Sequence, residues 1–236
     1  MRLAVITGEK GGVGKTTVAN IVASWADRIG IGWCGSDTDS VNKGFAARYQ
    51  SRVSSPEIYV DGELSHEATN DMLLASIDST RPEALRLIDV GAGHLQALAP
   101  LLGHAATVTP VTVVYVVTNW RDSLSTLAES SCLFDDQPNV NWLVVRNEVA
   151  GPLAEYDASK IRKAMQDRGA REITLRRLGN SAALAAWASM LSGNRLSTLD
   201  EFLAADDRKL FFLQGAIAGW RQAAFDQLDC VKDLFV

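Results

Sequence analysis

A glycine-rich segment near the N-terminus is compatible with few folds. The segment reads Gly8-Glu-Lys-Gly-Gly-Val-Gly-Lys-Thr-Thr17. It follows an apolar run over residues 3–7, which is predicted to be a buried strand, and it opens a stretch over residues 15–29 with the apolar spacing of a helix. Glycines allow the backbone to turn so that successive N–H groups face a phosphate, and the start of a helix adds partial positive charge. A phosphate-binding loop between a strand and a helix is therefore predicted.

The side chains of this segment suit a nucleoside triphosphate that carries a magnesium ion. Lys15 can reach the β- and γ-phosphates, the Thr16 hydroxyl can take a Mg²⁺ position, and Thr17 can bond the α-phosphate. The general pattern also requires a glycine at position 9, where this chain has Glu9. The backbone of the phosphate cradle is expected to come from Gly11, Gly12, Val13 and Gly14.

The variant Lys-Gly-Gly-x-Gly-Lys-Thr, which starts at Lys10, resembles the deviant Walker A loop of the ParA/MinD family of P-loop ATPases. Glu9 is similar to the non-glycine residue common at this position in the partition branch. The resemblance implies that Lys10 acts in catalysis by crossing a subunit boundary to touch the partner's bound phosphates. ATP would then favour a homodimer and hydrolysis the monomer, because loss of the γ-phosphate weakens this bridge. Intrinsic turnover should be slow, since such a switch works only while the ATP state persists.

Two acidic segments follow predicted strands in the order that the resemblance requires. Asp37-Thr38-Asp39 is similar to the family's switch I, which implies that Asp39 orients the attacking water and that Asp37 lies near the magnesium ion. Asp89 ends the apolar run over residues 84–89, as a Walker B carboxylate does when it holds Mg²⁺ through water. Taken alone, aspartates after strands are also common in turns and at helix caps.

The residues after Asp89, Val90-Gly91-Ala92-Gly93, resemble the family's switch II, in which Gly93 would lend its N–H to the γ-phosphate. Many relatives have proline where this chain has Gly91, so this loop is expected to be more flexible. His94 comes next and is expected near the γ-phosphate, although lone histidines are more often surface or cap residues. None of the three histidines has metal-ligand spacing.

A strand predicted over residues 141–146 ends next to Asn147. The resemblance implies that Asn147 reads the adenine edge, which favours ATP over GTP. A GTPase would be expected to show Asn-Lys-x-Asp, and the segment Asn147-Glu-Val-Ala150 does not match it. An asparagine in an ordinary turn is the alternative. ATP and Mg²⁺ are thus the expected ligands.

Apolar strands alternate with helical patterns along most of the 236 residues. Uninterrupted apolar strands between helices favour a parallel sheet covered on both faces. The expected fold is therefore α/β, a doubly wound, mostly parallel sheet with ligands at the carboxyl ends of its strands, in a single domain over residues 1–236. Residues 197–236 should form a helical segment packed on this domain. Further strands are expected over 31–36, 111–118 and 173–175, and further helices over 65–79, 96–103, 122–134, 157–168 and 180–191.

The formal net charge of −5 excludes binding to DNA or an anionic membrane through overall charge. A basic cluster in the last third, similar to that of small partition ATPases, supports nonspecific DNA binding; solvated helix faces are the alternative. Residues 224–236 carry too many acids for a membrane-targeting helix. The three cysteines are isolated, which excludes the usual zinc and iron–sulfur ligand sets and suits a reduced cytoplasmic protein. The basic cluster in the last third of the chain comprises Lys160, Arg162, Lys163, Arg168, Arg171, Arg176, Arg177, Arg195, Arg208 and Lys209.

Together these inferences favour an ATP-dependent dimerisation switch that positions or segregates DNA, as in plasmid partition, with a ParB-like protein or another plasmid-encoded adaptor as its activator. One alternative is an accessory ATPase of conjugative transfer that acts through protein partners only. Another is a metabolic ATP-dependent enzyme on the same fold, although the paired cysteines of reductases and iron–sulfur carriers are lacking. A scaffold without turnover is disfavoured, because Lys15, Thr16, Asp39 and Asp89 are all present.

Overall fold

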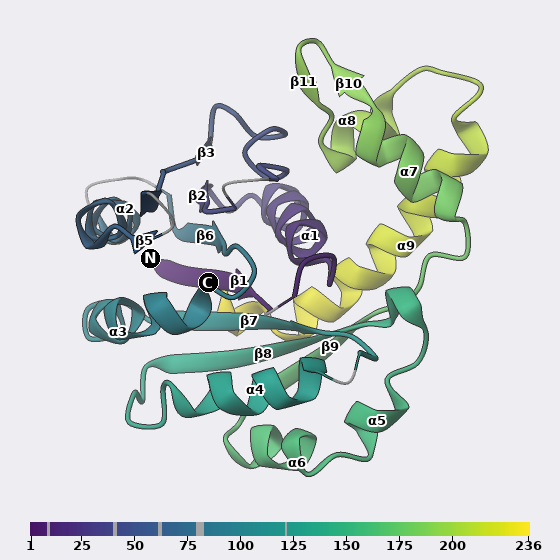
Figure 1. Cartoon of the computed structure of the whole chain (residues 1–236). Coiled ribbons are helices and arrows are strands. Elements are labelled where there is room, and N and C mark those ends of the chain that lie inside the picture. Colours follow the sequence, from purple (N-terminus) through teal and green to yellow (C-terminus); the bar gives the residue numbers. More distant parts are fainter. Residues whose placement is uncertain (9, 40–41, 61–62, 79–82, 121) are drawn as a thin grey trace.

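The computed structural model describes residues 1–236 except 9, 40–41, 61–62, 79–82 and 121 (Figure 1). Its centre is a seven-stranded sheet with the order β3-β2-β6-β1-β7-β8-β9, in which neighbouring strands are parallel. This arrangement confirms the doubly wound α/β fold. The strands are β1 Arg2–Thr7, β2 Trp33–Asp37, β3 Val53–Ser54, β6 Leu85–Asp89, β7 Val111–Val117, β8 Val140–Asn147 and β9 Arg171–Leu175.

Helices cover both faces of the sheet (Figure 1). Successive side chains of a strand point to opposite faces, so each strand contributes to the packing on both sides. In β7, Val114 and Val116 belong to one core and Val113 and Tyr115 to the other. The first core lies under α1 Lys15–Arg28, α7 Ser181–Ser189, α8 Leu199–Ala204 and α9 Phe211–Cys230. The second lies under α2 His66–Ile77, α3 Leu95–Ala105, α4 Asp122–Cys132, α5 Ala154–Asp157 and α6 Lys160–Asp167.

The C-terminal segment is helical, as predicted, and contacts α1. Thr198 is the N-cap of α8 and forms a capping box with Glu201. The Trp25 indole of α1 donates a hydrogen bond to Asp229 of α9 at 2.8 Å, and its ring meets that of Phe235 with centroids 5.5 Å apart. Because Phe235 is fully buried, the end of the chain is part of the first core.

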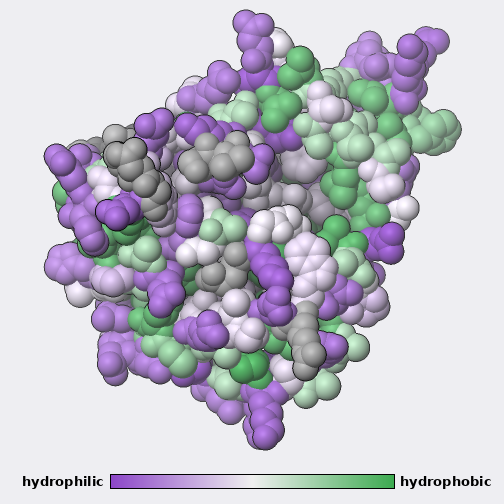
Figure 2. Space-filling model, viewed as in Figure 1, coloured by the Kyte–Doolittle hydropathy of each residue, from purple (hydrophilic) through white to green (hydrophobic). Residues whose placement is uncertain are grey.

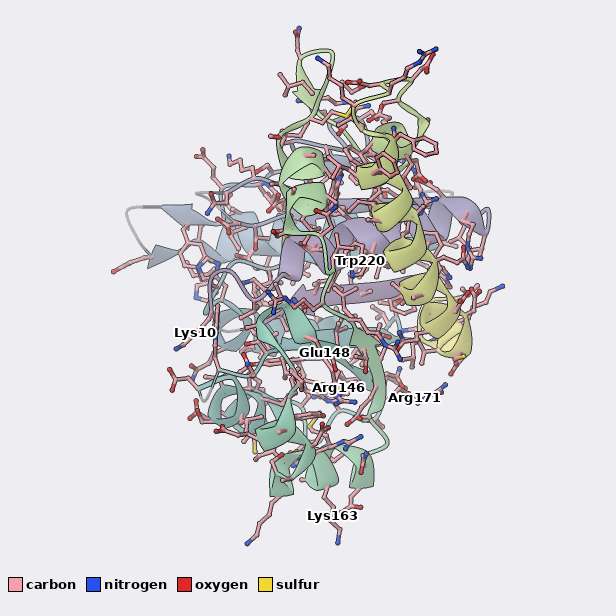
Figure 3. The ribbon with its side chains drawn as sticks, turned by 90° about the vertical axis from the view of Figure 1, so that its right-hand side faces the viewer. Lys10, Arg146, Glu148, Lys163, Arg171 and Trp220 are labelled. Carbon is pink, nitrogen blue, oxygen red and sulfur yellow. The ribbon has the colours of Figure 1, made fainter. Side chains whose placement is uncertain are left out.

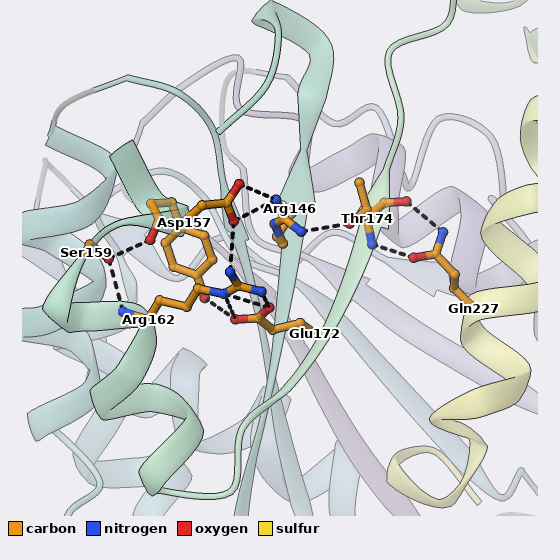
Figure 4. A network of polar contacts seen from close by, with 8 residues as sticks. Arg146, Asp157, Ser159, Arg162, Glu172, Thr174 and Gln227 are labelled. Carbon is orange, nitrogen blue, oxygen red and sulfur yellow. Dashed lines mark hydrogen bonds and ion pairs between the residues drawn. The ribbon is translucent and has the colours of Figure 1, made fainter. Parts of the chain in front are cut away.

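A polar network joins the edge strand β9 to its neighbours (Figure 4). Gln227 of α9 pairs with this strand: Thr174 N donates to Gln227 Oε1 at 2.6 Å, and Gln227 Nε2 donates to the Thr174 carbonyl at 2.7 Å. Arg162 of α6 donates to both carboxylate oxygens of Glu172. Backbone groups at a sheet edge can pair with another chain. The Gln227 amide therefore closes part of this edge.

Hydrophobic side chains are exposed at the start of α9. Figure 2 shows green atoms gathered at the upper right, over the region where Figure 1 draws α7 and the beginning of α9. Phe211 and Phe212 are 68% and 83% exposed, and their rings pack edge to face. This patch lies within residues 197–236, for which the sequence predicted a helical segment but no exposed apolar surface.

Several elements differ from the sequence-based expectation. The helix expected over residues 157–168 is two helices, α5 and α6, because the Ser159 hydroxyl caps the second by accepting from Arg162 N at 3.1 Å. Two hairpins and the edge strand β3 were not predicted, since strands of two residues carry no alternating pattern. The hairpins are β4 Tyr59–Val60 with β5 Glu63–Leu64, and β10 Leu191–Ser192 with β11 Arg195–Leu196.

Candidate phosphate-binding site

The glycine-rich loop connects β1 to α1 at the carboxyl edge of the parallel sheet (Figure 1). The φ angles of Gly12 and Gly14 are 81° and 96°, values that residues with a side chain rarely adopt. Gly14 is the N-cap of α1, and the first turn of this helix contains no acid. The N–H groups and the positive end of the helix dipole therefore favour an anion in the loop. Gly11 is exposed and Val13 is buried, while Glu9 lies outside the described residues.

Lys15 occupies the first position of α1, and only 7% of the residue is exposed. Its ammonium donates to the Lys10 carbonyl at 3.0 Å, so the side chain turns back beneath the loop. A cation held inside the loop can neutralise phosphate oxygens that the loop N–H groups bind. Thr17 follows in the first turn and is half-buried.

Thr16 and Asp89 meet at the base of the loop. The Thr16 hydroxyl donates to Asp89 Oδ2 at 2.7 Å, because β6 lies next to β1 and ends level with the start of α1. Asp89 is 1% exposed, and burial raises the pKa of its carboxyl group to about 7, against the lowering effect of the Thr16 hydrogen bond. Within the described part of the chain nothing bonds the other oxygen, Oδ1, which is also buried.

This pair fits a magnesium ion. Mg²⁺ prefers oxygen ligands and commonly uses one or two carboxylates together with substrate phosphates and water. The hydroxyl of Thr16 and the unbonded oxygen of Asp89 supply such ligands beside a phosphate-binding loop. The metal roles of Thr16 and Asp89 stay predictions, which the chemistry of these two groups suits.

Asp37 has a structural task that the sequence analysis did not include. Its carboxylate is fully buried and accepts hydrogen bonds from the N–H groups of Asp39, Phe45 and Ala46 at 3.0–3.1 Å. Burial raises the pKa of Asp37, and these backbone bonds oppose the rise. The Asp37 carboxylate thus holds the start of the loop that follows β2. Asp37 lies beside Asp89 in the register of β2 and β6, and its metal role stays a prediction.

Thr38 connects the two switch segments. Its N–H donates to the Asp89 carbonyl at 2.9 Å, and its hydroxyl accepts from Gly91 N at 3.1 Å. These contacts of Thr38 were not predicted, because its burial is a property of the folded chain and the sequence shows only a threonine between two aspartates. Asp39 is half-buried and accepts from Asn42 N at 2.8 Å, and Gly93 is exposed with a φ of 76°.

Lys10 lies on the outside of the loop. Figure 3 places it near the left edge of the view, well away from α9. Its ammonium forms an ion pair with Asp122 at the start of α4, and the two side chains are 45% and 61% exposed. Trp120, in the same loop after β7, is 39% exposed, and a Cβ atom at Gly12 would lie 3.8 Å from its Cη2. Neither Trp120 nor Asp122 was predicted from the sequence to lie at this site.

Asn147 supports the loop from below. It is 5% exposed, its Nδ2 donates to the Val13 carbonyl at 2.7 Å, and its Oδ1 accepts from Val149 N at 3.2 Å. A Cβ atom at position 14 would collide with this amide, which is a second reason for glycine there. The adenine-reading role of Asn147 stays a prediction, and loop support is an additional role.

The ten residues of the basic cluster predicted from the sequence divide into two groups. The first group forms ion pairs within the chain: Arg162 with Asp157 and Glu172, Arg168 with Asp135, Arg171 with Asp233, and Arg195 with Glu201. The second group is exposed, and no ion pair is found for it among the described residues: Lys160, Lys163, Arg176, Arg177, Arg208 and Lys209. Only this second group is fully available to an anionic partner.

Searches of the described residues for other kinds of site found two absences. No group of three or more His, Cys, Asp and Glu side chains that could hold a metal lies within that part of the chain. Nor does it contain a helix whose length and apolar character would allow it to cross a membrane.

Comparisons with known proteins place the fold. No family model matches the sequence, and no curated protein does. A chain of the MinC:MinD cell division protein complex of Aquifex aeolicus is 15% identical, with a TM-score of 0.56 over 94% of this chain and 95% of that one. The pNOB8 ParA structure is 12% identical, with a TM-score of 0.52 over 97% and 99% of the two chains. A Borrelia burgdorferi B31 protein assigned to plasmid partition, bound to AMPPNP, is 12% identical, with a TM-score of 0.51 over 93% and 97%.

The chain thus has the fold of the MinD and ParA structures over nearly its whole length. The resemblance inferred from the loop and switch motifs is confirmed at the level of the fold.

Proposed function

We propose that this chain is a ParA/MinD-family ATPase: a single-domain, Mg²⁺-dependent enzyme that dimerises with ATP, hydrolyses it slowly, and positions or segregates DNA. The hydrogen bond between Thr16 and Asp89 carries the proposal, because it brings a hydroxyl and a buried carboxylate together at the base of a phosphate-binding loop. The fold likeness to a protein that binds AMPPNP, an ATP analogue, adds support.

The loop residues bind the nucleotide. Gly11, Gly12, Val13 and Gly14 surround the phosphates with N–H groups, Lys15 neutralises the β- and γ-phosphates, and Thr17 bonds the α-phosphate. Thr16 and Asp89 hold Mg²⁺, which spreads the negative charge of the triphosphate when it is bound. Asn147 selects adenine, and the Gly93 N–H contacts the γ-phosphate.

Hydrolysis needs a positioned water and stabilisation of the charge that develops on the γ-phosphate. Asp39 orients the water from the loop that Asp37 holds in place. Lys10 supplies the second positive charge from the partner subunit. Because Lys10 is exposed on the outer side of the loop, its ammonium can leave Asp122 for an opposing phosphate without unfolding any element.

The exposed basic group carries the interaction with DNA. Lys160, Lys163, Arg176 and Arg177 can each contact a backbone phosphate, and dimerisation doubles the number of such contacts. An activating adaptor of ParB type would complete the cycle in the cytoplasm. The ion pairs of Arg162, Arg168, Arg171 and Arg195 favour a second candidate, an accessory ATPase that acts through protein partners only, because they reduce the available positive charge.

Sedimentation and DNA retention with ATP, ADP and no nucleotide test these statements. Lys15→Ala should abolish nucleotide binding, and Asp39→Ala should give an ATP-bound dimer that retains DNA and turns over at least about tenfold more slowly. Lys232→Ala, which removes an exposed lysine far from the loop, serves as the control. A dimer indifferent to nucleotide would contradict the proposal, and ATP-dependent dimers that ignore DNA would favour the protein-only candidate.

A further inference from the structure

His94 lies beside switch II, the segment of residues 90–93, without serving the helix that follows it. It is the N-cap residue of α3, yet its side chain forms no capping hydrogen bond. Instead the imidazole lies on the ring of Tyr59 in β4, with centroids 4.1 Å apart and planes inclined by 36°. The ring is therefore fixed by a neighbour outside its own helix.

The imidazole also lies close to the backbone of Gly91. A Cβ atom at position 91 would lie 2.6 Å from His94 Nδ1 and 2.8 Å from its Cε1, distances that real Cβ atoms do not show. The same Cβ atom would lie 3.5 Å from the Cα atom of Asp39. Gly91, His94 and Asp39 thus lie close together. The φ angle of Gly91 is not positive, so the backbone conformation does not by itself require glycine at this position. A side chain at position 91 would therefore displace the ring of His94.

The polar atom Nδ1 of the imidazole is a second feature of this site. Nδ1 is buried, and no described residue bonds it. A buried polar atom without a hydrogen bond is energetically unfavourable, so a state in which Nδ1 finds a donor or acceptor is favoured. Burial lowers the pKa of His94, which Asp39 raises and Lys15 lowers further. Asp39 of switch I and Lys15 of the phosphate-binding loop thus both act electrostatically on the imidazole.

We propose that His94 is a positioning residue for ATP hydrolysis: its imidazole, packed on Tyr59 and close to Gly91, holds the switch II backbone beside Asp39 through a hydrogen bond that Nδ1 forms in the ATP state. This inference rests on the proposed ATPase function. In the ATP state, contact of Gly93 with the γ-phosphate moves the switch II backbone, and Nδ1 gains its hydrogen bond there. The expected effect of His94 is on the hydrolytic step, because the nucleotide itself is held by the loop of residues 10–17.

Three variants separate this role from simple packing. His94→Phe keeps the ring on Tyr59 and removes the nitrogen, and kcat should fall about tenfold while KM and the Kd for Mg·ATP stay within about twofold. His94→Asn keeps a polar atom near the position of Nδ1 and should recover most of the lost kcat. His66→Asn, at an exposed histidine on α2, is the matched control and should leave every constant unchanged.

A double-mutant cycle tests the contact with Gly91. Gly91→Ala should lower kcat about as much as His94→Phe, because the new methyl group displaces the ring, but it should cost little in a His94→Ala background. Additive effects in this cycle, or a His94→Phe enzyme with wild-type kcat, would overturn the inference. Thermal unfolding of each variant identifies a loss due to misfolding, and the conservative Asn variant then decides the outcome.

The two proposals fail differently. A wild-type chain that neither binds nor hydrolyses Mg·ATP would refute the ATPase function and this inference with it. A wild-type chain that hydrolyses ATP while the His94 variants keep its kcat would refute only the positioning role.

Discussion

The ammonium of Lys10 forms an ion pair with the carboxylate of Asp122, which lies 112 residues away in the sequence. In a single chain this contact holds Lys10 on its own α4 rather than extended toward a second nucleotide. The lysine must leave Asp122 before it can act on a partner. The ion pair therefore competes with the proposed dimer.

Asp122→Asn should strengthen ATP-dependent dimerisation. The pair is exposed, so its loss is expected to shift the dimer dissociation constant by no more than about fivefold, or roughly 1 kcal/mol. Analytical ultracentrifugation with ATP at low and high salt measures the shift, which should shrink as salt screens the pair. A variant that no longer dimerises would show instead that Asp122 itself belongs to the interface.

Asp37→Asn should destabilise the chain in the absence of any nucleotide. Three backbone N–H groups converge on the Asp37 carboxylate, and an amide can accept from only some of them. We expect a loss of about 1–3 kcal/mol in the free energy of unfolding, measured by urea denaturation. Asp39→Asn, at the half-buried neighbour, should change it by less than about 0.5 kcal/mol. Equal stability of the two variants would contradict the anchoring role of Asp37.

Glu201 gives the fold a dependence on acid pH. Hydrogen bonds from Arg195 lower the pKa of Glu201 to about 2, and the Thr198 N–H contributes in the same direction. A carboxylate whose pKa is lower in the folded chain stabilises it above the unfolded pKa, near 4.5, and this contribution is lost as pH falls toward about 2.

Glu201→Gln isolates this effect, because glutamine can still complete the capping box at Thr198. The variant should be less stable than the wild type by about 0.5 kcal/mol at pH 7, a small value because the ion pair is partly exposed. The difference should disappear by about pH 2–3 in urea denaturation curves. A constant difference across this range would mean that the charge of Glu201 contributes nothing.

Phe235→Ala should cost about 3 kcal/mol of stability. The ring is fully buried against Trp25, and truncating a buried phenylalanine removes contacts and leaves a cavity. Phe212→Ala, at a ring that is 83% exposed, is the matched control and should change the free energy of unfolding by less than about 0.5 kcal/mol. Similar losses for the two variants would contradict the view that the C-terminus belongs to the first core.

The fold and the nucleotide loop were predictable because each has a strong local signal. The run of β7 is apolar except for Thr112 and buried at every residue, and glycines at 12 and 14 take the positive φ angles that the loop requires. The contacts of Asp37, Thr38 and Asn147 were not predictable, because they depend on which backbone groups lie nearby once strands pair. The position of the His94 ring near Gly91 was likewise not predictable. It depends on the packing of this ring on Tyr59, which the sequence around residues 91–94 does not indicate.

The side-chain amide of Gln227 occupies backbone groups of β9 that a new strand would need. At the other end of the sheet, β3 has only two residues and offers little length to a visiting strand. Growth of the sheet from chain to chain is therefore obstructed at both ends. These two features favour association between copies through loops and helices rather than through the edges of the sheet.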